Sequence, residues 1–430
     1  MKKCLIYLLV LLTLLFSACG KVINEEGNEN KPINTNKTTL LNNVEDPKGE
    51  ISSFDFLDQN GKLVEKINNF SIDLTLEYLK NYKGNDVISP ISVYMALAMA
   101  YEVLDEDMKA NYLNGLGLTE SDLSKTRDLV EVLTNTTLYD HKEVSKSLLT
   151  NSIWFDSDNS YEYNKDILDR LSKYYYCHAM QAPFQTDNAK ANKLLKDFVA
   201  DKTNDLIKKD FDLSPNTVSV IVNTLYLKDM WTDEGFLKVE ENLFNDVKKD
   251  FIVGKYHVGK VYKDTNYSTF YTETYSGYKI HILMPNKGVD LFDVLSSKNI
   301  KDMLERKYVE SDDKAKEKYY TRVIMPKFEA TSDIDFKEIL TNKYNLGFIF
   351  DEFTSPLVND RVYFSGVNHS AILKVDETGI EGAAVTYMPM ATKGLDPYQE
   401  VFLDYVLNYS FFFVITDEAG ISLFSGVVTK

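Results

Sequence analysis

The stretch DETGIEGAAVTYMPM, from Asp376 to Met390, follows a run, AILKV, that is typical of a β-strand. Small residues then take over, where a strand should either continue with bulky side chains or stop in a polar turn. The stretch is therefore a linker, a strand that loses its pattern, or a segment built to occupy two environments in turn. The remainder of the chain decides between these three interpretations.

Composition sets the outer limits. The 430 residues are 44% hydrophobic and 13% aromatic, enough to bury one very large core or two ordinary ones. The formal net charge of -17 argues against a nucleic-acid partner, because affinity for phosphate comes largely from clustered Lys and Arg. From about residue 61 to residue 430 the composition shows no break and no repeat, so we expect one large domain there.

The first eighteen residues read as an export signal. Lys2 and Lys3 precede a largely apolar run, Leu5 to Phe16, that is too short to span a bilayer, which takes about 20 residues. Ser17-Ala18-Cys19 then resembles a bacterial lipoprotein signal, in which the Cys becomes the lipidated first residue. The alternative is a conventional secretory signal that leaves Cys19 a free thiol. Either reading predicts an extracytoplasmic protein, anchored at the cell surface by an N-terminal lipid or secreted.

Residues 19–60 are rich in Asn, Glu, Lys and Thr and offer little to bury, so we expect a flexible polar tether there. With Cys4 in the signal and Cys19 lipidated, Cys177 is left without an intramolecular disulfide partner. We expect it to be a thiol without a functional role.

The domain itself predicts an α+β fold. Helical periodicity is clear in Ile91 to Leu104, Ala189 to Ile207 and Asp290 to Leu304. Runs rich in β-branched and aromatic residues predict strands at Val218 to Lys228, Tyr278 to Pro285, Arg322 to Ala330 and Val362 to Glu377. The end of the chain predicts a hairpin that turns at Asp417 to Gly420. Helices early and strands late favour α+β over a parallel doubly wound sheet.

Enzyme chemistry has little support. The five histidines, His141, His178, His257, His281 and His369, include no pair at helical metal-ligand spacing, and no nucleophile elbow or glycine-rich phosphate loop is present. We therefore expect no catalytic residues, no metal and no cofactor. Two polar residues within apolar runs, Asn223 and His369, are more informative, because a buried polar side chain without a partner costs about 1 to 3 kcal/mol. They are either satisfied core hydrogen bonds or a polar lock where a sheet can open.

At this point the residues match a family: the region from about Asn68 to Lys430 resembles the serpins, serine protease inhibitors of the large conformational type. Five separated segments carry the resemblance in the right order. They are DVISPISVYMALAM (Asp86 to Met99), FVADKTNDLI (Phe198 to Ile207), VNTLYLKDMW (Val222 to Trp231), IMPKF (Ile324 to Phe328) and VNHSAILKVDETGIEGAA (Val367 to Ala384). The resemblance implies a serpin fold with a large central mixed or antiparallel sheet, two further sheets, a helical N-terminal half and an exposed reactive loop at about 377–400.

The resemblance also implies roles for single residues. The shutter, a hydrogen-bonded cluster beneath the central sheet, would be Ser89, Ser92, Asn223 and His369, with Asn223 and His369 as partners. The breach at the top of that sheet would be Trp231 and an ion pair of Glu377 with Lys327. The hinge of the reactive loop would be Glu377, Gly379, Ile380, Gly382, Ala383 and Ala384.

The family's mechanism implies that a protease cuts the loop, is held as an acyl-enzyme, and is inactivated when the cut loop enters the central sheet. Strand alternation allows this, because Ile380, Gly382, Ala384, Thr386 and Met388 would share one face and the charge of Glu381 falls on the other. Ile380 is bulkier than is usual in the family, and Gly382 gives up backbone entropy; both could slow insertion.

Hinge spacing puts the cut between Lys393 and Gly394, which suits the acidic specificity pocket of a trypsin-like protease. Counting back from the strands at Phe411 gives a site about six residues later, near Gln399, and Met390 and Tyr398 are further alternatives. We expect a monomer that forms a covalent complex with a serine protease. The alternative function is a non-inhibitory serpin-fold surface lipoprotein that acts as a binding or adhesion module.

Overall fold

The computed structural model describes residues 39–42, 44–81, 84–139, 142–157, 162–231, 238–381 and 398–430. The expected signal peptide, Cys19 and most of the expected tether lie outside these ranges. Within them the chain has helices and several mainly antiparallel sheets, which confirms the predicted α+β fold. No helix in these ranges is both long enough and apolar enough to cross a membrane.

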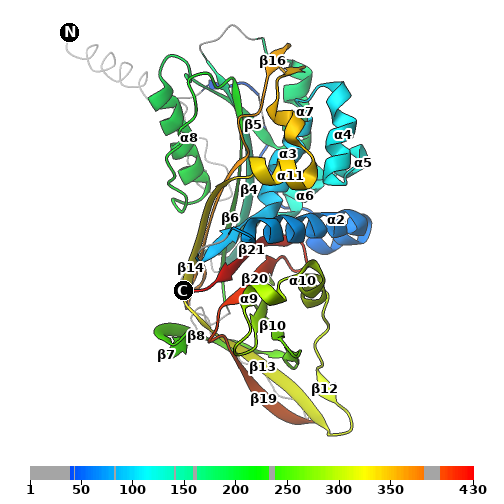
Figure 1. The fold of residues 1–430 in the computed structure, drawn as a ribbon, viewed down its shortest axis with the longest axis vertical. Helices are drawn as coiled ribbons and strands as arrows, with labels where there is room; N and C mark the ends of the chain where they lie inside the picture. The colour runs from blue at the N-terminus through cyan, green and yellow to red at the C-terminus, as the bar shows by residue number, and fades with distance from the viewer. Residues whose placement is uncertain are drawn as a thin grey trace, which may run out of the picture. The chain divides into compact units, whose positions relative to one another are not determined.

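Helices dominate the first half of the domain, as predicted (Figure 1). They are α2 (Ser53–Leu79), α3 (Pro90–Tyr101), α4 (Glu106–Leu116), α5 (Glu120–Leu123), α6 (Thr126–Val132), α7 (Lys165–Tyr175) and α8 (Asn188–Lys202). Later in the chain follow α9 (Leu291–Val294), α10 (Ser297–Leu304), α11 (Lys337–Tyr344) and a 3-10 helix (Gly347–Phe350).

Among the described residues, the central sheet has eight strands in the order β1-β5-β4-β6-β18-β17-β14, and β3 pairs with β4. The strands are β1 (Thr39–Leu40), β3 (Asn135–Tyr139), β4 (Lys142–Asp156), β5 (Cys177–Ala182), β6 (Ser219–Met230), β14 (Phe328–Asp335), β17 (Asn368–Val375) and β18 (Gly379–Ile380). β4 and β5 run parallel and the other pairs are antiparallel, so the sheet is mixed.

The described part of the chain also contains two further large sheets and one short strand pair. The six-stranded sheet contains β2 (Asp86–Ile88), β21 (Ser422–Val428), β20 (Phe411–Thr416), β11 (Lys279–Pro285), β10 (Tyr267–Glu273) and β9 (Tyr262–Lys263). The five-stranded sheet contains β12 (Ser311–Asp312), β13 (Glu317–Pro326), β8 (Val247–Val258), β7 (Lys238–Phe244) and β19 (Gln399–Val406). β15 (Phe353–Ser355) and β16 (Asp360–Val362) form a separate hairpin.

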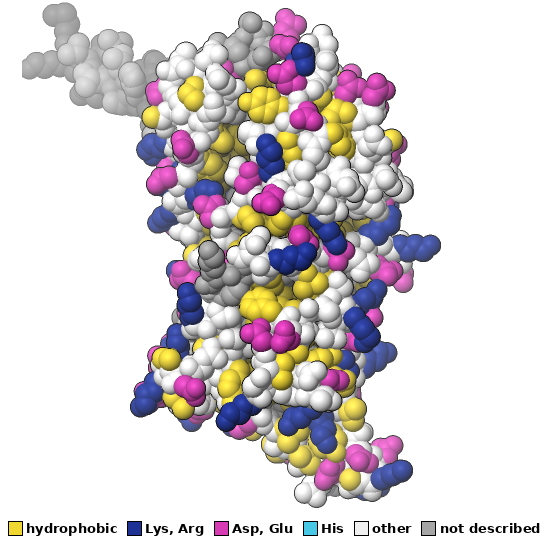
Figure 2. Space-filling view, viewed as in Figure 1, with side chains coloured by type: hydrophobic (Ala, Val, Ile, Leu, Met, Phe, Trp, Pro, Cys, Tyr) yellow, Lys and Arg dark blue, Asp and Glu magenta, His cyan; other side chains and the backbone are white. Residues whose placement is uncertain are grey.

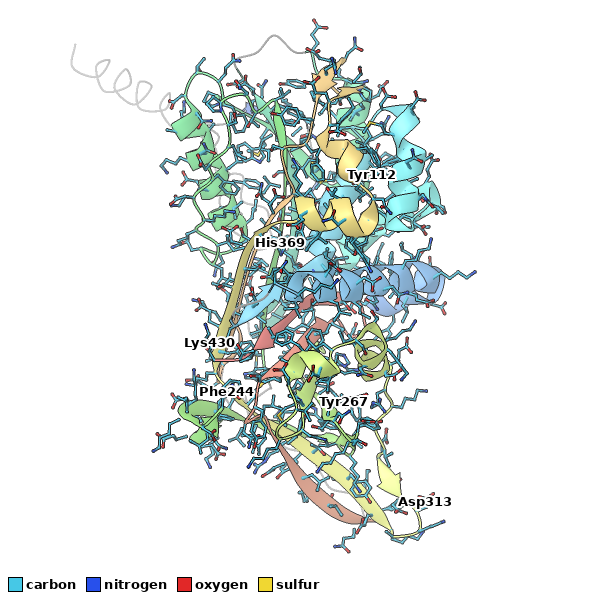
Figure 3. The ribbon with its side chains drawn as sticks, viewed as in Figure 1. Tyr112, Phe244, Tyr267, Asp313, His369 and Lys430 are labelled. Atoms are coloured by element: carbon cyan, nitrogen blue, oxygen red, sulfur yellow. The ribbon has the colours of Figure 1, made fainter. Side chains whose placement is uncertain are left out.

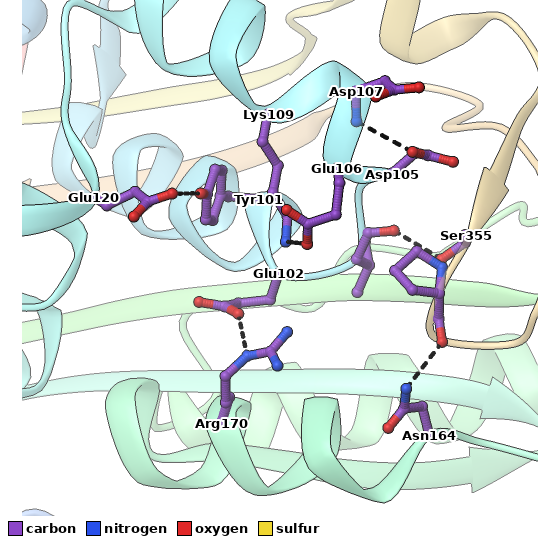
Figure 4. Close-up of polar contacts among 12 residues, drawn as sticks. Tyr101, Glu102, Asp105, Glu106, Asp107, Lys109, Glu120, Asn164, Arg170 and Ser355 are labelled. Carbon is purple, nitrogen blue, oxygen red and sulfur yellow. Dashed lines mark hydrogen bonds and ion pairs between the residues drawn. The ribbon is translucent and has the colours of Figure 1, made fainter.

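Helix α3 packs against one face of the central sheet. It begins at Pro90, directly after the N-cap Ser89, because a proline in the first helical position needs no partner for its missing N–H. Nearly all of its residues are buried against β6 and β21. At its far end Glu102 forms an ion pair with Arg170 of α7, 2.7 Å from carboxylate to guanidinium (Figure 4). This ion pair ties the C-terminal end of α3 to α7.

The folded domain begins earlier than the predicted boundary at residue 61. Thr39 and Leu40 already pair with β5, and α2 starts at Ser53, where the side chain of Ser52 caps the helix. Phe56 is 2% exposed and belongs to the main core. The polar composition of this segment hides the few apolar residues that pack, so residues 39–60 are not simply a tether.

Two predicted elements are divided in the structure. The helix expected over Asp290 to Leu304 is two short helices, α9 and α10, and the strand expected over Arg322 to Ala330 is parts of β13 and β14, which belong to different sheets. Lys327, between β13 and β14, is the point where the chain changes sheet. The predicted C-terminal hairpin is confirmed as β20 and β21, and both strands are buried on both faces.

Candidate functional site

The short strand β18 enters the central sheet between β6 and β17. Gly379 pairs with Met230, and Ile380 pairs with Asp229 on one side and with Val375 on the other. Gly379 and Ile380, near the start of the predicted loop, are therefore buried rather than exposed: the apolar side chain of Ile380 lies in the core (0% exposed) and its backbone has two strand partners. The bulk of Ile380, noted above as unusual, fits this place.

Beyond β18, toward the first residues of β6 and β17, the central sheet is open. Among the described residues, none of Ser219–Lys228 on β6 is paired with any of Asn368–Lys374 on β17, and we call this unpaired length the seam. A pocket of about 370 Å³ lies along the seam, with α3 on one side and the segment after α8 on the other. The two strands that flank it are otherwise fully paired to β4 and β14. The seam has the position that a further strand would occupy.

Three of the four predicted shutter residues meet beside the seam. The ring nitrogen Nε2 of His369 accepts a hydrogen bond from the backbone N–H of Ser89 (3.1 Å), and the hydroxyls of Ser89 and Ser92 are 3.0 Å apart. The Ser89 hydroxyl also donates to the carbonyl of Leu423 (2.9 Å), which ties α3 to β21. Figure 3 shows His369 where the central sheet meets the helical half. These contacts connect β17, α3 and the C-terminal hairpin.

The expected hydrogen bond between Asn223 and His369 is absent from this structure, in which both residues are described. The two side chains line the same pocket, but the seam separates β6 from β17 at this level. Asn223 donates instead to Asn151 Oδ1 of β4 (2.6 Å), and its own Oδ1 is buried without a partner. Asn151 was missed in the sequence, although it too is a polar residue within an apolar run, LLTNSIW, and the same criterion would have found it.

Burial lowers the pKa of His369 to about 4, and the nearby Lys209 acts in the same direction while Asp333 opposes it. The side chain is therefore neutral at pH 7, as its acceptor role toward Ser89 requires. Because the pKa in the folded state lies below the ordinary value of 6.5, the unfolded state binds the proton first as the pH falls.

We expect His369 to make the fold sensitive to acid. Its contribution to stability is complete above about pH 6.5 and is lost between pH 6.5 and 4, with a slope of at most about 1.4 kcal/mol per pH unit. Urea unfolding at pH 7 and pH 5 should therefore give a smaller difference for His369→Gln than for the wild type. Other buried titrating groups, namely His257, His281, Asp229 and Asp417, are common to both proteins and cancel. An equal difference in the two proteins would contradict this role.

The predicted breach residues also lie together, at the C-terminal end of β6. The indole N–H of Trp231 donates to the carbonyl of Asp376, and its backbone N–H donates to that of Thr378 (3.4 Å). Glu377 and Lys327 do form the expected ion pair, 2.8 Å between carboxylate and ammonium. Their hydrogen bond lowers the pKa of Glu377 and raises that of Lys327. Both side chains are about 30% exposed, so the pair is worth at most about 1 kcal/mol.

Gly379 is required where β18 meets β6. A Cβ atom at this position would lie 2.0 Å from the carbonyl oxygen of Asp229, which is backbone and cannot move aside easily. The Asp229 carboxylate is itself buried and accepts hydrogen bonds from the backbone N–H (3.0 Å) and hydroxyl (3.2 Å) of Ser276. Burial nevertheless raises the pKa of Asp229 to about 6.

Glu381 ends β18. It adopts a left-handed backbone conformation with φ 68°, which is costly for a residue with a side chain. Its carboxylate accepts hydrogen bonds from the hydroxyl of Tyr226 and from the side-chain amide of Asn204 (3.2 Å), on the α8 side of the sheet. Ile380 and Glu381 thus face opposite sides, as strand alternation predicts. Tyr226 and Asn204 were not predicted as site residues, because only the fold brings them to the loop.

The rest of the predicted loop lies outside the described residues. This holds for Gly382, Ala383, Ala384, Lys393 and Gly394, and for the alternative position Met390. The structure resumes at Tyr398, whose hydroxyl donates to Asp313 (2.7 Å), and Gln399 is the first residue of β19.

The described residues contain no group of three or more His, Cys, Asp or Glu side chains that could hold a metal ion. Cys177 is a free, fully buried thiol in the main core, and burial raises its pKa. The arrangement is thus an opening in a sheet, flanked by polar side chains, with one end of a loop already seated in it.

Comparison with known proteins agrees with this geometry. The family model described as serpin (serine protease inhibitor) matches residues 65–430. An uncharacterized serpin-like protein of Thermococcus kodakarensis is 25% identical over 86% of this chain and 85% of its own length, and neuroserpin of Homo sapiens is 25% identical over 80% and 85%. The native state of the thermophilic serpin tengpin superposes with a TM-score of 0.70 at 23% identity, covering 92% of this chain and all of that one. The chain belongs to the serpin family.

Proposed function

We propose that this serpin inhibits trypsin-like serine proteases by insertion of its cleaved reactive loop into the seam. The observation that carries the proposal is β18, which seats the first two residues of a strand in line with the seam. Insertion then extends a strand that already exists. It does not have to begin a new one.

The register of β18 supports the insertion. If the strand continues, each further loop residue pairs with the next earlier residue of β6 and of β17. Thr386 then reaches Asn223 on β6 and His369 on β17 at the same step. The two neighbouring strands are thus aligned for one common central strand. The hydroxyl of Thr386 would then lie between Asn223, whose Oδ1 has no partner, and His369.

The length of the seam supports the position of the cut. Continuing the same register, Met390 would reach Ser219, the first residue of β6. Lys393 lies just beyond, so a protease bound to it as an ester would be carried to the far end of the sheet. The inserting segment therefore ends level with the first residue of β6, and Lys393 stays outside the sheet.

The other end of the loop favours the earlier cut over one near Gln399. The backbone N–H of Gln399 donates to the carbonyl of Lys316 (2.7 Å), and every residue of β19 is paired in parallel with β13. A protease active site needs an extended peptide on both sides of the cut. A cut near Gln399 would require β19 to separate from its sheet, whereas Lys393 and Gly394 precede these contacts.

In the proposed reaction the protease supplies the chemistry. Its serine attacks the carbonyl carbon of Lys393, the bond to Gly394 breaks, and the new amine of Gly394 takes a proton from the protease. The ester that remains would normally be hydrolysed by water. Insertion of residues 381–390 before that hydrolysis would pull the ester from its oxyanion hole, so the inhibitor works once.

Export is part of the proposal and rests on the N-terminal sequence alone. The charged and apolar start and the Ser17-Ala18-Cys19 sequence support an extracytoplasmic protein tethered by a lipid on Cys19. Its targets would then be extracellular proteases.

One mixing experiment tests the proposal. The protein is incubated with trypsin-like, subtilisin-like and chymotrypsin-like proteases and separated on denaturing gels. We expect an SDS-resistant complex with the trypsin-like enzyme and release of a peptide that begins at Gly394. If every protease cleaves the loop and keeps its activity, the inhibitor proposal is wrong.

A further inference from the structure

An aromatic face lies on the solvent side of the five-stranded sheet. Tyr256 of β8, Tyr320 of β13 and Phe402 of β19 are neighbours across three adjacent strands. Tyr256 is 39% exposed and Phe402 is 54% exposed, whereas Tyr319 and Tyr405 on the inner side are buried. Figure 2 shows hydrophobic side chains among Lys and Arg at the end of the domain where β13 and β19 lie in Figure 1.

The side chains of the aromatic face are held in place by one another. The ring of Phe402 stacks on Tyr320 (5.4 Å between centroids) and meets Tyr256 edge-on (4.9 Å). The guanidinium of Arg322 lies over Tyr256 (5.0 Å) and makes two hydrogen bonds to Asp404 (2.6 and 3.1 Å). Rigid aromatic and Arg side chains lose little entropy on binding and are the residue types most enriched at binding hot spots.

The position of the aromatic face on the chain indicates its partner. Phe402 is on the strand that begins where the reactive loop rejoins the sheet, and Tyr398 is fixed there to Asp313, at the end of the sheet shown in Figure 3. Four residues lie between Lys393 and Tyr398, so these two residues are at most about 17 Å apart along an extended chain. Phe402 lies about 13 Å further along. A protease domain of about 220 residues has a radius of gyration of about 17 Å, so its body would reach this face while it holds the loop.

We propose that the aromatic face of Tyr256, Tyr320 and Phe402 is a second docking surface for the protease that attacks the loop. This inference rests on the proposed inhibitory function and adds a determinant of protease choice outside the loop. Contacts there act on the encounter complex. They speed capture, and they leave the later competition between insertion and hydrolysis unchanged.

The test uses a matched pair of variants of the full chain. Phe402→Ala removes the centre of the aromatic face, and Phe54→Ala removes an equally exposed ring (55%) from the first turn of α2. Trypsin with its catalytic serine replaced by alanine serves as a probe that binds without acylation. We expect Phe402→Ala to weaken binding of this probe about tenfold and to slow complex formation with active trypsin about tenfold, since a hot-spot truncation costs at least about 1.4 kcal/mol. Phe54→Ala should change either quantity less than twofold.

The outcomes separate this inference from the proposed function. If the wild type forms the SDS-resistant complex and Phe402→Ala forms it equally fast, the docking surface is wrong and the inhibitor stands. If the wild type forms no complex with any protease, both are wrong. A loss of self-association in Phe402→Ala, with capture unchanged, would assign the face to a second copy of the chain and also overturn the proposal. Equal numbers of inhibitor molecules consumed per protease by both variants confirm that the loop still inserts.

Discussion

Ala384→Glu should convert the protein from an inhibitor into a substrate. The register of β18 brings residue 384 opposite Leu225 of β6 and Ala371 of β17, which are 8% and 6% exposed and face the main core. A carboxylate placed there without a partner costs several kcal/mol, and each 1.4 kcal/mol slows insertion about tenfold relative to hydrolysis. Titration of trypsin should show at least about ten inhibitor molecules consumed per protease, against about one for the wild type.

The matched control is Ala383→Glu, which adds the same charge one residue earlier. It falls on the α8 side of the strand, where Glu381 already finds hydrogen-bond donors in Tyr226 and Asn204. We expect its stoichiometry to stay within about twofold of the wild type. Equal effects of the two substitutions would contradict the assignment of faces, and no effect of either would contradict insertion.

Cleavage of the loop should stabilise the protein strongly. Insertion would pair residues 381–390 with β6 and residues 381–387 also with β17, which adds about 15 new hydrogen bonds at about 1 kcal/mol each. It would also fill the seam and satisfy Asn223. We expect the thermal midpoint to rise by at least about 20 °C after a non-target protease cuts between residues 391 and 397, which leaves residues 381–390 attached to β18.

The same measurement separates the two functions that the serpin fold allows. A binding or adhesion module has no need of a metastable sheet, so its midpoint would not move on cleavage. A shift below a few degrees would favour that alternative. The control is the same protein incubated with protease that was inactivated beforehand, so that its loop stays intact.

The sequence predicted those parts of the site whose residues belong to recognisable local motifs. Ser89, Ser92 and His369 meet as expected, and Glu377 pairs with Lys327, because these residues belong to segments matched one by one to the family. The α+β class followed from the order of helical and strand patterns. Motif matching assigns a residue to a neighbourhood and says little of how that neighbourhood is arranged in a given chain.

The parts that were missed depend on contacts between distant segments. The seated β18 depends on Asp229, some 150 residues earlier in the chain, and the true partner of Asn223 is Asn151 of another strand. The start of α2 was missed because its few apolar residues, Phe56 among them, are scattered in a polar segment. In each case a side chain or backbone group is satisfied by a neighbour that only the folded sheet supplies.

Amide hydrogen exchange along the seam tests the central claim most directly. β6 and β17 each bond to a neighbouring strand on one edge, and their other edges face the seam. If the cleaved loop enters, the seam-facing amides of Ser219–Lys228 and Asn368–Lys374 should exchange at least about a hundredfold more slowly after cleavage, because opening them then requires breaking the central sheet. Unchanged exchange in a chain whose loop is fully cut would show that the loop stays outside, and the proposed mechanism would be wrong.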